Sequence, residues 1–286
     1  MSRPGFCFLP GRTAACAVAA LAILQLFSLF ASAQFTPFGT LVNPPLNPPA
    51  MAESSGLAAS KRWPGVIWTH VDGGSQFLFA MRTNGVYIRS FPVGAPFVDW
   101  EDIMADDSGN LYLADTGSDG AQRSHVAIHR VREPDPYKSK NVQVDRTWYV
   151  RFPGQRKNCE AFFILDGRGY LVTKAELGGR VAIYDFALAN RARSILLERV
   201  TTVDVPSDVT AATISADSSR LALLTDKGPV VYLINGNVRA IRSSVAYYSP
   251  FPSTVIEGAT FIGDGLLVSS EMGELFLFTN PQFQTR

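Results

Sequence analysis

Short apolar runs recur at a long and nearly regular interval along this chain. Most of them follow a cluster of Gly, Asp, Asn or Ser, which is the pattern of strands joined by tight turns. The equivalent positions are 45, 59, 51 and 45 residues apart, and they are Val66, Leu111, Tyr170, Leu221 and Leu266. A repeat of about 40–50 residues with several strands per unit is typical of propeller blades, whereas a β-sandwich has no such long-range phase. We therefore predict an all-β, single-domain, five-bladed β-propeller, with six blades as the alternative.

The first 33 residues have the pattern of a secretory signal peptide. Arg3 and Arg12 supply positive charge, a 17-residue apolar run covers residues 14–30, and Ala31-Ser32-Ala33 offers a cleavage site before Gln34. A retained membrane anchor is the alternative, but a membrane span needs about 20 residues. We therefore expect export to the periplasm or the exterior, with membrane contact only through the uncleaved signal.

Residues 34–52 are predicted to be a proline-rich linker. The segment contains two proline pairs, Pro44-Pro45 and Pro48-Pro49, which remove backbone donors and keep the chain extended. Residues 35–42 form a candidate strand that could close the last blade. No comparable break follows, so residues 53–286 are assigned to the propeller domain.

Charge and cysteine content exclude some classes of partner and bond. The chain has 26 basic and 25 acidic residues, so its charge gives no reason to expect a nucleic acid partner. Cys159 is the only cysteine outside the signal segment, so the exported chain forms no internal disulfide. We expect Cys159 to be a small buried residue.

Glutamates recur at nearly the same phase of four units. Counted back from the reference positions, they lie 13, 10, 10 and 9 residues earlier, and they are Glu53, Glu101, Glu160 and Glu257. In the fourth unit the matching residue is Thr213, 8 residues before Leu221. The first strand of a blade lines the central channel, so residues at one phase should face one another near one mouth. These four glutamates are therefore the candidate metal ligands.

Carboxylates so close together cannot all ionise without compensation. Three arrangements are open: a bound hard cation such as Ca²⁺, a counter-charge from Lys174, or raised pKa values with shared protons. The alternative reading makes each Glu an ordinary solvated residue at a strand start.

A second set of polar residues follows the reference strands. With Glu53, the candidate ligand-binding residues are Asp72, Asp115 and Glu271, and Lys174, Thr225 and Asp226 occupy comparable places. They could cap the same mouth, or they could be turn residues. The sequence contains no His-Glu-x-x-His, no Gly-x-Ser-x-Gly elbow and no phosphate-binding loop, so it gives no local support for a zinc protease, serine hydrolase or nucleotide enzyme.

Several segments together resemble a family of secreted bacterial β-propeller proteins. They are Glu53 to Ser60 (ESSGLAAS), Asp99 to Ile103 (DWEDI), Glu160-Ala161 and Glu257-Gly258-Ala259. The chain departs from the family pattern at Thr116-Gly117, at Asn158-Cys159 and at Thr213, where the family carries an Asp. The resemblance implies a propeller fold, with more distant architectural similarity to phytase-like and gluconolactonase-like propellers.

Two functional hypotheses follow. The first is an exported, monomeric propeller without catalytic activity, which binds a metal ion or small polar ligand at the mouth or serves as a scaffold for a protein partner. The second is a calcium-dependent hydrolase of phosphoesters or lactones, in which the metal polarises the substrate and activates water. Its candidate catalytic residues are Glu101, Asp102 and Lys174, and calcium is the expected cofactor.

Overall fold

The computed structural model describes seven stretches of the chain, namely residues 37–40, 53–72, 76–94, 97–117, 123–175, 180–251 and 255–279. The chain divides into residues 1–34 and residues 35–286, and all of the described residues lie in the second part. The predicted signal peptide, residues 1–33, lies outside the described residues. No helix in the described stretches is long and apolar enough to cross a membrane.

The first two units each contain four antiparallel strands. Unit one consists of β2 (Ser54–Ala59), β3 (Val66–Val71), β4 (Phe77–Arg82) and β5 (Tyr87–Gly94). Unit two consists of β6 (Trp100–Ala105), β7 (Asn110–Asp115), β8 (Val126–Arg132) and β9 (Val142–Arg151). The two units share one continuous sheet, because the ends of β5 and β9 pair in parallel over two residue pairs, Val93 with Val142 and Gly94 with Gln143.

The next two units repeat this pattern. Unit three consists of β10 (Cys159–Leu165), β11 (Arg168–Thr173), β12 (Arg180–Ala187) and β14 (Glu198–Asp204). The two-residue β13 (Ile195–Leu196) pairs with β9 of unit two instead. Unit four consists of β15 (Val209–Ile214), β16 (Arg220–Thr225), β17 (Gly228–Leu233) and β18 (Ala246–Tyr248). A short 3-10 helix, η2 (Val238–Ser243), precedes β18.

The fifth unit combines strands from both ends of the described chain. It consists of β19 (Ile256–Ile262), β20 (Gly265–Ser270), β21 (Leu275–Phe278) and β1 (Pro37–Thr40). β1 pairs antiparallel with β21, from Pro37 opposite Phe278 to Thr40 opposite Phe276. The outermost strand of the last unit therefore comes from the N-terminal side of the chain. The predicted boundary between linker and domain at residue 52 lies in a masked stretch and stays a prediction.

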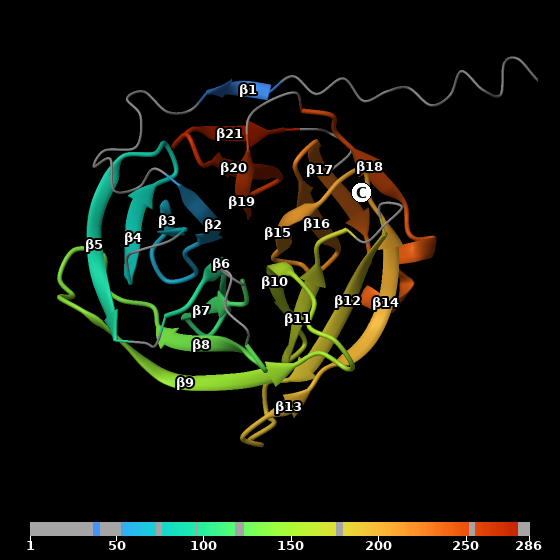
Figure 1. The fold of residues 1–286 in the computed structure, drawn as a ribbon. Helices are drawn as coiled ribbons and strands as arrows, with labels where there is room; N and C mark the ends of the chain where they lie inside the picture. The colour runs from blue at the N-terminus through green and yellow to red at the C-terminus, as the bar shows by residue number, and fades with distance from the viewer. Residues whose placement is uncertain are drawn as a thin grey trace, which may run out of the picture. The chain divides into compact units, whose positions relative to one another are not determined.

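The first strands of the five units form a closed ring. β2 contacts β6, β6 contacts β10, β10 contacts β15, β15 contacts β19, and β19 contacts β2 (Figure 1). In each unit the following strands lie progressively farther from the centre (Figure 1). The structure is therefore an all-β propeller, which confirms the predicted fold class. The five apolar runs that revealed the repeat are the second strands β3, β7, β11, β16 and β20.

Apolar side chains fill the space between each pair of neighbouring units. Trp68 and Trp100 belong to the cluster between units one and two, and Cys159 and Phe162 to the cluster between units two and three. Separate clusters lie between units three and four, four and five, and five and one. The sheets are thus buried on both faces, which explains why their strands read as short continuous apolar runs. Cys159 is fully buried, as predicted.

Candidate functional site

Each inner strand carries a β-bulge near its start. One residue is left unpaired at the register shift of each strand, and these residues are Gly56, Glu101, Glu160, Thr210 and Glu257. Bulges of this kind often re-aim a side chain at the rim of a barrel or next to an active site. Three of the four predicted glutamates therefore do occupy one repeated position.

The other two members of the predicted set lie elsewhere. Gly56, not Glu53, has the bulge position in unit one, and Thr210, not Thr213, has it in unit four. The sequence count was misled because the hairpin between β2 and β3 is longer than the other first hairpins of the units. Thr213 pairs with Ala222 well inside β15, farther from this mouth.

A second repeated feature is a backbone hydrogen bond beside the bulge. A residue after the second strand donates its N–H to a residue before the first strand, over 2.9–3.2 Å. The donor residues are Asp72, Gly117, Lys174, Asp226 and Glu271, and the acceptors are Glu53, Asp99, Asn158, Asp208 and Val255. The structure thus places Asp72, Lys174 and Glu271 at one equivalent position, as predicted, but Gly117 replaces Asp115 in that set.

We call the carboxyl residues of these three sets the acidic mouth. They are Glu53, Asp72, Asp99, Glu101, Glu160, Asp208, Asp226, Glu257 and Glu271. Lys174 is the one cation in the same three sets. Sequence reasoning missed Asp99 and Asp208 as members, although both lie two residues before a bulge, which is a signal that could have found them.

Burial and repulsion raise the pKa of two glutamates in the acidic mouth. The pKa of Glu101 rises to about 9, chiefly because of burial and then because of the charges of Glu160 and Asp99. The pKa of Glu257 rises to about 8, again chiefly through burial, with repulsion from Glu160 and partial relief from Lys174. Both carboxyls therefore hold their protons at pH 7.

Glu160 is compensated differently, because Lys174 forms an ion pair with it. Burial raises the pKa of Glu160, and the contact with Lys174 opposes that rise. Burial acts to lower the pKa of Lys174, but the Glu160 contact outweighs it and the pKa is raised. A counter-charge and retained protons, two arrangements left open by the sequence, thus occur at different positions of one mouth.

Glu53, Asp72 and Glu271 form a connected group where unit five meets unit one. The Glu53 N–H donates to the Glu271 carbonyl over 2.8 Å, and the Asp72 N–H donates to the Glu53 carbonyl over 2.9 Å. Glu53 has a φ of 67°, in the left-handed region, so this turn is a constrained one. Burial raises the pKa of Glu271, with added repulsion from Asp72 and Glu53.

Asp102 lies deeper than its neighbour Glu101 and does not join the acidic mouth. It is fully buried. One carboxyl oxygen accepts from the Ile103 N–H at 2.8 Å, and the other accepts from Phe162 at 2.9 Å and Ala212 at 3.2 Å. Burial raises the pKa of Asp102, and these three donors oppose the rise. Asp102 therefore cross-links the inner strands of units two, three and four, and it is not placed to act beside Glu101 as a catalytic pair.

Asp115 is also occupied by internal partners. Its Oδ1 accepts from the Asp99 N–H at 2.8 Å and pairs with Arg123 at 2.8 Å. Its Oδ2 lies 3.6 Å from His129 Nε2. Burial would raise the pKa of Asp115, but His129 and Arg123 outweigh that effect and the pKa is lowered. The predicted ligand-binding carboxylate is thus an ionised anchor for the segment that leads into β6.

Gly117 is a site residue that sequence reasoning missed. A Cβ atom there would lie 1.9 Å from Glu101 Oε1 and 2.3 Å from Asp99 Oδ2. Its carbonyl accepts from Arg156 Nη2 at 2.8 Å. The absence of a side chain at this position is therefore what allows Glu101 and Asp99 to approach the backbone of unit two.

The described residues contain no group of three or more His, Cys, Asp or Glu side chains arranged to hold a metal ion. Ca²⁺ takes six to eight oxygen ligands at about 2.3–2.6 Å. The carboxyls of the acidic mouth lie within electrostatic reach of one another without forming such a cage. Calcium binding by Glu53, Glu101, Glu160 and Glu257 stays a prediction.

Comparison with known proteins adds no family assignment. No family model matches the chain, and no curated protein matches it. Among solved structures, it is similar to a gluconolactonase of Xanthomonas campestris (14% identity, 80% of this chain and 73% of that chain, TM-score 0.47). It is also similar to virginiamycin B lyase of Staphylococcus aureus (15%, 82% and 68%, TM-score 0.42).

Two further similarities are to protein assemblies. A chain of the nidogen/laminin complex shares 12% identity over 82% of each chain, with a TM-score of 0.46. A chain of the mitotic checkpoint complex shares 13% identity, and this chain covers only 60% of its length, with a TM-score of 0.41. All of these TM-scores are below 0.5, so the assignment of the propeller fold rests on the sheet topology described above.

Proposed function

We propose that this protein is an exported β-propeller that binds a small polar or cationic ligand at the acidic mouth. The observation that supports this most directly is the shared bulge position of Glu101, Glu160 and Glu257. Burying and crowding carboxyl groups costs folding stability, as the raised pKa values of Glu101 and Glu257 express. A ligand that pairs with these groups recovers that cost only in the bound state.

The protonation of the acidic mouth determines how it would treat different ligands. Protonated Glu101 and Glu257 can donate hydrogen bonds, whereas ionised carboxylates only accept them. A cation would favour the ionised forms, lower both pKa values and release protons on binding. A neutral polyhydroxyl ligand would use the donors and acceptors together and release none. Proton release therefore separates the two ligand classes.

The test is a titration of the mature protein in weak buffer at pH 7.5, with calcium chloride in one arm and glucose in the other. Heat reports binding, and a pH electrode reports protons. We expect binding in one arm, with proton release if that arm is calcium. Glu101→Gln and Glu257→Gln should each weaken binding, whereas Glu198→Gln, a change at an exposed residue of outer strand β14, should not.

Two results would contradict this proposal. One is the absence of binding in both arms, and the other is binding that all three Gln variants leave unchanged. Turnover of a lactone or phosphoester by the calcium-loaded protein, abolished by Glu101→Gln, would instead favour the hydrolase alternative. Export is tested separately, because N-terminal sequencing of the secreted protein should begin at or near Gln34.

A further inference from the structure

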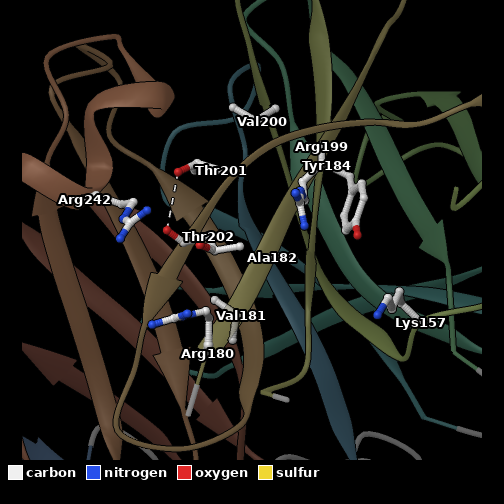
Figure 2. Close-up of a pocket in the computed structure, with 10 residues that line it drawn as sticks. All are labelled: Lys157, Arg180, Val181, Ala182, Tyr184, Arg199, Val200, Thr201, Thr202 and Arg242. Carbon is white, nitrogen blue, oxygen red and sulfur yellow. Dashed lines mark hydrogen bonds between the residues drawn. The ribbon is translucent and has the colours of Figure 1, made fainter. Parts of the chain in front are cut away.

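A second pocket lies on the outer part of unit three, away from the inner strands. Its volume is about 580 Å³, within the roughly 300–1,000 Å³ range of small-molecule sites. Strands β12 and β14 supply most of its lining, the segment before β10 supplies Lys157, and η2 supplies Arg242. Figure 2 shows Arg180, Arg242 and Thr202 grouped at one end of the pocket and Arg199 beside Tyr184 at the other.

The pairing of β12 with β14 explains the hollow. Ala182 pairs with Thr202 and Tyr184 pairs with Arg199, with a register shift between Ile183 and Tyr184. Alternate residues of a strand share one face, so Arg180, Ala182 and Tyr184 point to the same side of β12. The small Ala182–Thr202 pair therefore leaves space between long side chains on either side of it.

The charge of this pocket is one-sided. Four cations line it, namely Lys157, Arg180, Arg199 and Arg242, and no Asp or Glu does. Arg180 pairs with Asp204 over 3.0 Å, in a contact where both side chains are largely exposed. Arg199 and Arg242 have no ion-pair partner within the described stretches. The chain as a whole carries a formal charge of only +1, so this excess is local.

Guanidinium groups recognise phosphate and carboxylate through paired, charge-assisted hydrogen bonds. The hydroxyl groups of Thr202 and Tyr184 add donors at the two ends of the same hollow. Like charges that converge without a counter-charge repel one another, and an anion with two or more charged groups would relieve that repulsion at both ends. From these features we infer that the pocket binds a small organic polyanion bearing phosphate or carboxylate groups.

The test measures binding of two probes, inorganic pyrophosphate and citrate, by calorimetry at low salt and again at 150 mM salt. Arg199→Gln and Arg242→Gln each remove one charge-assisted contact, so each should weaken binding about tenfold. Arg82→Gln is the matched control, because Arg82 is exposed on β4 of unit one and its loss changes the net charge equally. Binding of pyrophosphate alone would identify a phosphate site, and binding of citrate alone a carboxylate site.

Other outcomes would overturn the inference. Neither probe binding below about 10 mM at low salt would do so, and so would an equal loss in Arg82→Gln and Arg199→Gln, which indicates only a diffuse field. Binding of heparin without either small probe would also contradict it, because a long polymer would then be using surface charge and not the pocket. Glu101→Gln should leave the affinity unchanged, so this test is independent of the acidic mouth.

Discussion

The inner and outer strands of this propeller use polar side chains in opposite ways. Around the inner ring, polar contacts cross from one unit to the next. The contacts run from Ser55 Oγ to the Glu101 carbonyl, from Phe162 N–H to Asp102, from Ala175 N–H to Asp208, from Thr210 Oγ1 to the Ile256 carbonyl, and from Ser54 Oγ to Ser269 Oγ. Every interface between neighbouring units thus has a polar contact as well as an apolar cluster.

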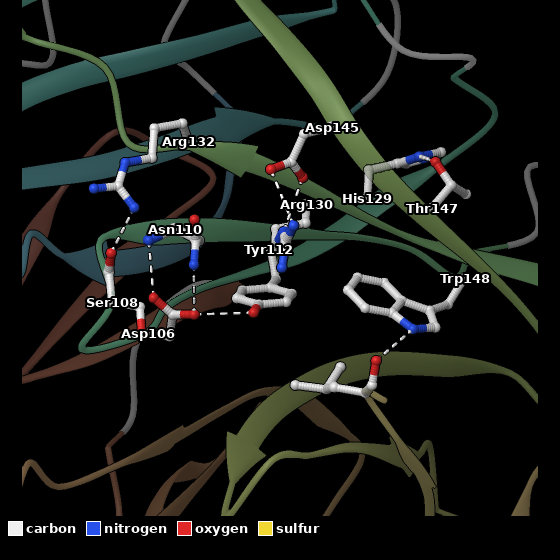
Figure 3. Close-up of polar contacts among 11 residues, drawn as sticks. Asp106, Ser108, Asn110, Tyr112, His129, Arg130, Arg132, Asp145, Thr147 and Trp148 are labelled. Atoms are coloured by element: carbon white, nitrogen blue, oxygen red, sulfur yellow. Dashed lines mark hydrogen bonds and ion pairs between the residues drawn. The ribbon is translucent and has the colours of Figure 1, made fainter. Parts of the chain in front are cut away.

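The outer strands instead use contacts within one unit, most of them exposed. Figure 3 shows one example, in which Arg130 on β8 binds both carboxyl oxygens of Asp145 on β9, at 2.8 and 3.1 Å. Their side chains are 29% and 44% exposed, and exposed pairs of this kind contribute about 0–1 kcal/mol. Outer charges can therefore change with little effect on the fold, whereas inner ones cannot. The acidic mouth is coupled to folding stability, and the basic pocket of unit three is not.

The strongest test of this contrast is Asp102→Ala. The change leaves the N–H groups of Phe162 and Ala212 buried without their acceptor, at a cost of about 1–3 kcal/mol each. We expect a loss of about 3 kcal/mol in the free energy of unfolding, measured in urea. Asp102→Asn keeps one acceptor oxygen and should lose less. A loss below about 1 kcal/mol for Asp102→Ala would show that the inner ring does not depend on this cross-link.

These contacts also show why the sequence predicted the fold better than the site. Apolar runs and turn residues mark β3, β7, β11, β16 and β20 directly, because both faces of each sheet are buried. The bulges leave no such mark, since one extra residue shifts the phase without changing the composition. Glu53 was therefore counted where Gly56 belongs. The four cations of the basic pocket, at positions 157, 180, 199 and 242, come together only through strand register and the placement of η2.

The next prediction concerns the one outer strand that comes from elsewhere in the chain. Deleting residues 34–43 removes β1 and leaves β21 as an unpaired edge. We expect the melting temperature to fall by several degrees, at about 2–4 °C per kcal/mol for a chain of this size. Ligand binding at the acidic mouth should survive, because no inner strand is touched. An unchanged melting temperature would mean that β1 contributes nothing to the fifth unit.

Gly117→Ala tests how closely the acidic mouth is packed. The new methyl group would meet Glu101 Oε1 and Asp99 Oδ2, so we expect a loss of about 1–3 kcal/mol, as for other overpacked sites. The same substitution in a Glu101→Ala background should cost less, because one of the two obstructing groups is gone. Equal losses in both backgrounds, measured by urea unfolding, would show that Glu101 does not lie against Gly117.

The smallest expected change, and the most specific, is in the pH dependence of Glu101→Gln. In the folded protein the pKa of Glu101 is about 9, against an ordinary value of 4.5. As the pH rises through this window, the unfolded chain loses the Glu101 proton while the folded chain keeps it. Unfolding of the wild-type protein is therefore progressively favoured, by at most about 1.4 kcal/mol per pH unit and by less where solvent screens the mouth.

Glutamine has no proton to lose, so the Glu101→Gln variant should gain stability relative to the wild-type protein between pH 5 and pH 8.5. Urea unfolding at several pH values measures this difference. Glu198→Gln, at an exposed site on outer strand β14, should run parallel to the wild-type curve. Glu257, whose pKa is about 8, remains in every variant, so its own contribution cancels in the comparison unless the two carboxyls are coupled. A Glu101→Gln curve parallel to the wild-type curve would show that this carboxyl ionises as an outer one does, and the distinction between the two layers would fail at the residue where it should be clearest.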